Sequence, residues 1–103
     1  MKFLLTIPAI LFATHAAAEC GVTRPAEAPE VPSGVTASKL EMYEAQKATQ
    51  AYVDQVAEFL KCREKAMSTL EHDYLADKAF DAAMDYNDEL KAYQRTQEAI
   101  ASN

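Results

Sequence analysis

Residues 38–103 read SKLEMYEAQKATQAYVDQVAEFLKCREKAMSTLEHDYLADKAFDAAMDYNDELKAYQRTQEAIASN, with no proline or glycine in the run. Alanine, glutamate, lysine, glutamine, leucine and methionine dominate it, and all of them favour α-helix. The tetrapeptides SKLE, beginning at Ser38, and STLE, beginning at Ser68, both match the capping box, in which a serine oxygen and a glutamate side chain each accept a backbone N–H. The sequence therefore predicts two helices of similar length, over about residues 38–66 and 69–100.

Apolar side chains fall on one stripe of each predicted helix when the residues are placed at about 100° intervals. The first stripe consists of Ala45, Tyr52, Val56, Phe59, Leu60, Met67 and Leu70, with Arg63 as its one charged member. The second, at spacings typical of a coiled coil, consists of Leu75, Ala79, Ala82, Tyr86, Leu90, Tyr93 and Ile100. The stripes predict an all-α, antiparallel, coiled-coil-like two-helix hairpin. Because no strong helix breaker lies between the helices, one continuous helix that dimerises as a long coiled coil is the alternative.

The segment before this run, residues 19–37, has a different composition. It holds three of the four prolines and both glycines of the chain, so a helix cannot continue through it. We expect an extended proline-rich tail that runs back beside the hairpin and precedes a single helical domain, residues 38–103.

The first eighteen residues have the three parts of a secretory signal peptide. A positive start at Lys2 is followed by an apolar run over residues 3–13 and by three alanines at residues 16–18. The run supplies about 11 apolar residues, whereas a membrane anchor needs about 17 to 25. Glu19 stands where a lipoprotein signal would have a small residue. We expect cleavage after residue 18 and a periplasmic or secreted protein without a membrane span.

Cys20 and Cys62 are the only two cysteines of the chain. An even number in a small exported protein favours an intramolecular disulfide, and the proline-rich tail is long enough to reach back along the first helix to Cys62. Closing this loop is expected to stabilise the fold by about 3 to 4 kcal/mol. No C-x-x-C pair is present, which argues against a redox-active role.

Composition and charge exclude several classes of function. The net charge is −6 over 103 residues, and it becomes more negative once Lys2 leaves with the signal peptide. Nucleic acids and anionic membranes both favour basic proteins, so neither is an expected partner. A chain of this length forms one small domain and is too short for a large enzyme.

The residues of a catalytic or metal site are missing, and we predict no enzymatic activity, no cofactor and no metal. His72 is the only histidine after the signal peptide. It lies beside Asp73 without a candidate nucleophile, because Ser68 is expected to cap a helix and both cysteines to be oxidised. Zinc sites and phosphate loops need second histidines, free cysteine clusters or glycine-rich turns.

Four aspartates recur at every fourth position of the second predicted helix, namely Asp73, Asp77, Asp81 and Asp85. This spacing stacks carboxylates along one side of the helix and costs about 0.2 to 0.5 kcal/mol per pair unless a cation or a basic partner offsets the repulsion. A solvated acidic face is the simplest interpretation, and weak cation binding is the alternative. Calcium is not indicated, since no glycine turn is present to wrap it.

Phe80 and Met84 project away from the predicted seam, among these aspartates and one helical turn apart. Two hypotheses account for such a pair. Either the two side chains anchor another chain, or the N-terminal tail covers them through Val22, Val31 or Val35. The sequence leaves both hypotheses open.

The order of several features is distinctive: a signal peptide, a cysteine, the stretch PEVPSG at residues 29–34, a helix with Met42, Tyr52 and Cys62, and FDAAMDYNDELKAY at residues 80–93. The chain resembles small uncharacterised exported proteins of proteobacteria that share a C…P-x-x-P-x-G…C pattern followed by two long helices. This resemblance implies periplasmic location and a helical architecture. It transfers no catalytic residue.

The sequence therefore predicts a non-enzymatic interaction or structural module that acts through an acidic outer face. Phe80 and Met84 would supply apolar contact, and the four aspartates would select a basic protein partner by charge. The chain itself would be a monomer or a homodimer. The alternatives are a weak cation-binding protein that uses the aspartate series, and a holdase-like periplasmic chaperone that shelters clients between the helical arms.

Overall fold

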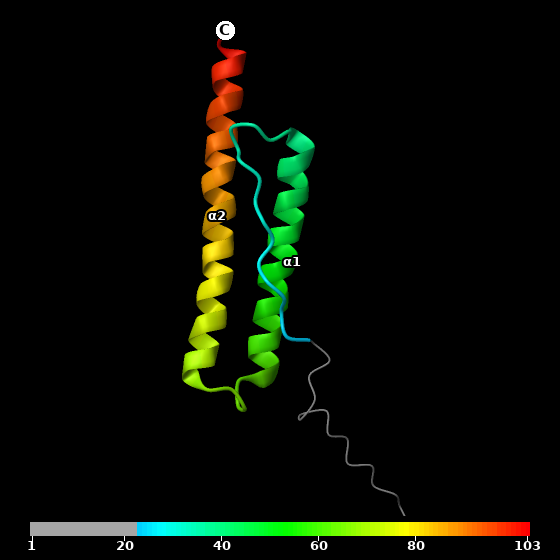
Figure 1. Ribbon diagram of the computed structural model, residues 1–103, viewed down its shortest axis with the longest axis vertical. Helices are drawn as coiled ribbons and strands as arrows, with labels where there is room; N and C mark the ends of the chain where they lie inside the picture. The colour runs from blue at the N-terminus through cyan, green and yellow to red at the C-terminus, as the bar shows by residue number, and fades with distance from the viewer. Residues whose placement is uncertain (1–22) are drawn as a thin grey trace, which may run out of the picture.

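The computed structural model describes residues 23–103, which form two helices joined by a short turn. Helix α1 spans Lys39–Arg63 and helix α2 spans Thr69–Ala101. The helices pack side by side and run in opposite directions (Figure 1). The predicted all-α hairpin is thus confirmed, and the alternative of one continuous helix is wrong. The predicted signal peptide, residues 1–18, and Cys20 lie outside the described residues. Neither helix combines the length and the apolar character needed to cross a membrane.

Both helices begin at the serines that the sequence marks as caps. The Ser38 hydroxyl accepts the Glu41 N–H at 3.0 Å, and the Glu41 carboxylate accepts the Ser38 N–H at 3.0 Å, which completes the capping box. At α2 the Ser68 hydroxyl accepts the Glu71 N–H at 3.1 Å. The Glu71 carboxylate, however, forms an ion pair with Arg24 of the tail. One half of the second box is therefore replaced by a long-range contact.

The turn between the helices starts earlier than the sequence suggests. Helix α1 ends at Arg63, where the carbonyl accepts the N–H of Ala66 at 2.9 Å in a tight turn. The turn occupies residues 64–68, so Leu70 lies at the exposed end of the hairpin. Leu70 is 81% exposed and does not join the seam, in contrast to the prediction.

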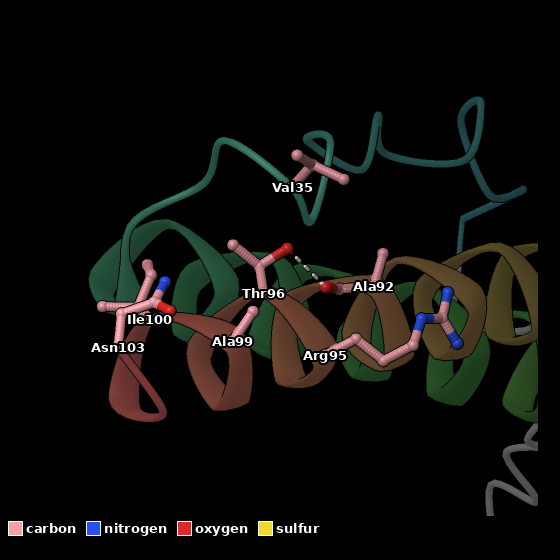
Figure 2. Close-up of a pocket in the computed structure, with 7 residues that line it drawn as sticks. All are labelled: Val35, Ala92, Arg95, Thr96, Ala99, Ile100 and Asn103. Atoms are coloured by element: carbon pink, nitrogen blue, oxygen red, sulfur yellow. Dashed lines mark hydrogen bonds between the residues drawn. The ribbon is translucent and has the colours of Figure 1, made fainter.

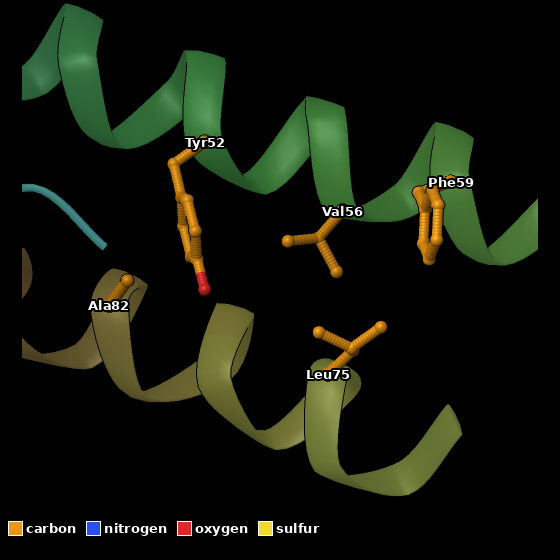
Figure 3. Close-up of a cluster of buried hydrophobic side chains, with 5 residues drawn as sticks. All are labelled: Tyr52, Val56, Phe59, Leu75 and Ala82. Carbon is orange, nitrogen blue, oxygen red and sulfur yellow. The ribbon is translucent and has the colours of Figure 1, made fainter. Parts of the chain in front are cut away.

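The hairpin is held together by two apolar clusters. In the turn-end cluster, Tyr52, Val56 and Phe59 of α1 pack against Leu75 and Ala82 of α2 (Figure 3). Val56 is the most deeply buried of these side chains, with 1% exposed. The members come from both arms at helical spacing, as expected for an apolar seam.

The open-end cluster lies near the start of α1. Met42 and Ala45 of α1 pack there with Tyr86 of α2 and with Ala37, the last tail residue before the Ser38 cap. Val31 of the tail packs against the same cluster. Because of this cluster the tail is part of the core, and the fold is more than a pair of helices.

Two seam positions and one helix end differ from the predicted stripes. Met42 and Thr49 are buried, at 3% and 6% exposed, although neither was assigned to a stripe. The buried hydroxyl of Thr49 has no hydrogen-bond partner among residues 23–103. Ile100 is 62% exposed because α2 is longer than α1 and its last turns project past the start of α1 (Figure 1).

The tail, residues 23–37, runs over the seam between the helices, from the turn end towards the start of α1 (Figure 1). Near its upper end the Gly34 N–H donates to the Glu89 carboxylate at 2.8 Å. A Cβ at Gly34 would lie 1.9 Å from the Glu89 carbonyl oxygen and 2.7 Å from the Tyr93 nitrogen. Only glycine lets the tail approach the α2 backbone this closely.

Candidate interaction face

The side of α2 that points away from α1 carries two large apolar side chains. At about 100° per residue, Phe80 and Met84 lie about 140° and 180° around the helix from the buried Leu75. Phe80 is 65% exposed and Met84 is 41% exposed. We call these two residues, together with the neighbouring Asp73, Asp77 and Asp81, the outer face of α2. All five side chains are exposed.

The described part of the tail does not cover the outer face. Val31 packs against the open-end cluster. Val35 is 60% exposed and lines a hollow beside the last turns of α2. Val22, the third valine considered for this role, lies outside the described residues. Within residues 23–103, Phe80 and Met84 are thus left open to another chain.

The four aspartates do not share one face. A step of four residues advances about 40° around an α-helix, so three steps rotate the series by about 120°. Asp73 lies between the Phe80 and Met84 directions, and Asp77 lies about 20° beyond Met84. Asp85, by contrast, borders the tail, where it lines a cavity of about 530 Å³ with Asp88, Glu89 and residues 28–31. The outer face therefore includes the carboxylates of Asp73, Asp77 and Asp81. Asp85 lies next to the outer face, on the side where the tail runs.

The acidic residues form no recognisable metal centre. Across residues 23–103, no group of three or more histidine, cysteine, aspartate and glutamate side chains is arranged to hold an ion. The His72 Nδ1 lies 3.4 Å from the Asp73 Oδ1, and both side chains are largely in solvent. This pair sits beside the turn, and its imidazole makes no hydrogen bond to a hydroxyl in the described part of the chain.

Cys62 lies near the end of α1 on its exposed side, and it is disulfide-bonded. Its predicted partner, Cys20, is outside the described residues. The space between the two arms is filled by the turn-end and open-end clusters. A holdase-like function would therefore have to use an outer surface of the hairpin and not the space between its arms.

The hollow beside the last turns of α2 measures about 330 Å³ (Figure 2). Its wall consists of Val35, Ala92, Arg95, Thr96, Ala99, Ile100 and Asn103. The Thr96 hydroxyl donates to the Ala92 carbonyl at 2.9 Å, so this polar group is satisfied within the helix. The hollow is a shallow, mostly apolar surface whose single charged side chain is Arg95.

Sequence reasoning missed a second cavity, which lies under residues 24–28 of the tail. Tyr52 of α1 and Tyr74, Leu75 and Lys78 of α2 line it. These residues become neighbours only when the tail docks over both helices, and the expectation of a tail beside the hairpin does not specify which residues meet. Comparison of the chain with protein-family models, with curated proteins and with solved structures finds no match.

Proposed function

We propose that the protein is a non-enzymatic interaction module of an exported compartment, and that it binds a basic, partly apolar protein surface through the outer face of α2. The observation that carries this proposal is the exposure of Phe80 and Met84, at 65% and 41%, on a side that neither α1 nor the described tail covers. Large apolar side chains grouped on one exposed helix face are typical of contact sites for other chains.

Apolar contact would supply the affinity. Full burial of a phenylalanine or methionine side chain stabilises a complex by about 1.5 to 3 kcal/mol. Leu70, which is 81% exposed, lies about 40° around the helix from Met84. From Leu70 to Met84, with Phe80 between them, the exposed apolar side chains are spread over about 21 Å of α2, since each residue rises about 1.5 Å. This length suits a partner helix or an extended segment laid along α2.

Charge would supply selectivity. Asp73, Asp77 and Asp81 lie beside the apolar pair, and like charges four residues apart repel by about 0.2 to 0.5 kcal/mol per pair. A basic partner relieves this repulsion when it binds, whereas an acidic one adds to it. The association should therefore weaken as salt rises, because exposed charges more than about 8 Å apart are screened at physiological ionic strength.

The test is recovery of partners from periplasmic extract by the immobilised wild-type protein and by the double variant Phe80→Ala/Met84→Ala. A matched control is Leu40→Ala/Tyr43→Ala, which removes two side chains of α1 that are 63% and 55% exposed. We expect the partner to be lost from the α2 variant and kept by the α1 variant. Unchanged recovery with Phe80→Ala/Met84→Ala would show that this face is not the site.

A triple variant with asparagine at positions 73, 77 and 81 tests the role of charge separately. It keeps the size of the side chains and removes three negative charges. We expect weaker binding at low salt, with affinity that no longer depends on ionic strength. A partner that binds this variant as tightly as the wild type, with the same salt dependence, is not selected by the aspartates.

We further propose that the disulfide of Cys62 joins it to Cys20, after removal of the signal peptide. The support is that Cys62 is disulfide-bonded and that the chain contains only one other cysteine. Intact mass spectrometry of the protein from periplasm, with and without reductant, tests the pairing. A monomer that begins at Glu19 and gains two mass units on reduction supports it, whereas a species that halves in mass on reduction contradicts it.

A further inference from the structure

A cavity of about 500 Å³ lies between residues 24–28 of the tail and the turn-end half of the hairpin. Tyr52 of α1 and Tyr74, Leu75 and Lys78 of α2 line its helical side. The volume falls within the range of about 300 to 1,000 Å³ in which small-molecule sites occur. Lys78 lies about 160° around α2 from Phe80, so the cavity is separate from the outer face.

The hydroxyl of Tyr52 gives the first indication of a ligand. Tyr52 is 7% exposed, and its side chain points from α1 towards α2 (Figure 3). Among residues 23–103, no protein group forms a hydrogen bond with this hydroxyl. The Tyr52 hydroxyl oxygen is not among the polar atoms shut off from solvent, so it is open to the cavity although the rest of the side chain is buried. Since Tyr52 lines the cavity, a molecule bound there can accept or donate that hydrogen bond.

The charges around the cavity indicate which kind of molecule fits. The Lys78 Nζ lies 5.4 Å from the centre of the Tyr74 ring, and no carboxylate of residues 23–103 lies within ion-pair distance of it. The other cation, Arg24, already pairs with Glu71. Glu27 is the single carboxylate in the wall. The cavity thus presents an available positive charge in a protein that is acidic overall.

We propose that this cavity binds a small organic carboxylate with an apolar body. The carboxylate accepts hydrogen bonds from the Lys78 ammonium and the Tyr52 hydroxyl, and the apolar body packs on Leu75 and the Tyr74 ring. A charge-assisted hydrogen bond is stronger than a neutral one, so Lys78 provides the larger share of the recognition. Because residues 24–28 form the opposite wall, the bound anion also holds the tail against the hairpin.

The experiment is a titration of the disulfide-bonded, signal-cleaved protein with 3-phenylpropionate, followed by amide chemical shifts. The uncharged 3-phenylpropan-1-ol has a closely similar body and serves as the ligand control. The variants are Lys78→Gln and Tyr52→Phe, which removes only the hydroxyl. Lys47→Gln is the matched protein control, because Lys47 lies over the Tyr43 ring at the same 5.4 Å but lines no part of the cavity.

We expect saturable amide shifts of residues 24, 26–28, 52 and 74–78, with binding about tenfold weaker for the alcohol and for each cavity variant. Lys47→Gln should bind as the wild type does. Three results would overturn the proposal. The first is the absence of a saturable shift up to about 10 mM acid, because a dissociation constant above that concentration is too weak for a binding site. The others are equal affinity for the acid and the alcohol, and unchanged binding by Lys78→Gln. Circular dichroism tests whether Tyr52→Phe is folded. If this variant does not fold, the affinity of Lys78→Gln decides the outcome, because Lys78 is exposed and its substitution leaves the core intact.

Discussion

Replacement of Gly34 by alanine is expected to displace the tail from α2 and to lower the free energy of unfolding by about 1.5 to 5.5 kcal/mol. The new Cβ would lie 1.9 Å from the Glu89 carbonyl oxygen and 2.7 Å from the Tyr93 nitrogen. Both neighbours are backbone atoms of α2, so a change of side-chain rotamer cannot relieve the clash. The tail itself has to move away.

The magnitude follows from that movement. An ordinary contact needs about 3.5 Å, so the tail must retreat by about 1.5 Å. This breaks the 2.8 Å hydrogen bond from the Gly34 N–H to the Glu89 carboxylate, which is worth about 1.5 to 3 kcal/mol because the acceptor is charged. Overpacking adds about 1 to 3 kcal/mol. The lower entropy of alanine in the unfolded chain offsets about 0.4 to 1 kcal/mol of this cost.

Urea and thermal unfolding, followed by circular dichroism, measure the change. For a domain of this size, 2 kcal/mol corresponds to a fall in Tm of about 8 °C or more. Val35→Ala is the control, since Val35 is 60% exposed and its loss should cost no more than about 0.5 kcal/mol. Hydrogen exchange should also show that tail amides lose protection in Gly34→Ala. A variant with wild-type stability and a protected tail would refute the close approach of Gly34 to α2.

Further predictions concern the seam, the first cap and the disulfide. Thr49→Val should raise the free energy of unfolding by about 1 kcal/mol, because it removes a buried hydroxyl without a partner, whereas a loss of stability in urea would mean that this hydroxyl is satisfied in solution. Ser38→Ala should cost about 1 kcal/mol through loss of the N-cap, measured in the same way, and an unchanged midpoint would contradict the observed cap. Reduction of the Cys62 disulfide should lower stability by about 3 to 4 kcal/mol if Cys20 is its partner, and an unchanged Tm in reductant would argue against a loop-closing bond.

The parts of the fold that depend on neighbouring residues could be predicted from the sequence. Ser38 and Ser68 are caps because a serine and a glutamate three residues later act within one turn. The ends of the stripes could not be placed, because they depend on where the hairpin turns. Once α1 ends at Arg63, Leu70 has no opposite residue, and the greater length of α2 leaves Ile100 unpaired.

The sequence predicts that the tail runs back beside the hairpin, but the contacts that the tail makes there could not be predicted, for the same reason. Gly34 and Glu89 are 55 residues apart in sequence, and their contact requires both helices to be in place. Periodicity did indicate that Phe80 and Met84 point outward, which their exposure matches. It did not show that Asp85 turns towards the tail, because residues spaced by four advance about 40° per step around an α-helix and do not stay on one straight line.

The two ends of the tail's contact with α2 set a length. Arg24 pairs with Glu71 and Gly34 with Glu89, and these anchors are about 27 Å apart along α2 at about 1.5 Å per residue. The ten steps along the tail from Arg24 to Gly34 reach about 31 Å in polyproline conformation, which leaves about 4 Å of slack. A slip of one helix past the other by a full turn would need about 5.4 Å. Gly34 is held on α2 and only residues 35–38 separate it from the first residue of α1. This short link, and not the slack between the two anchors on α2, keeps two arms with a regularly repeating seam in a single register.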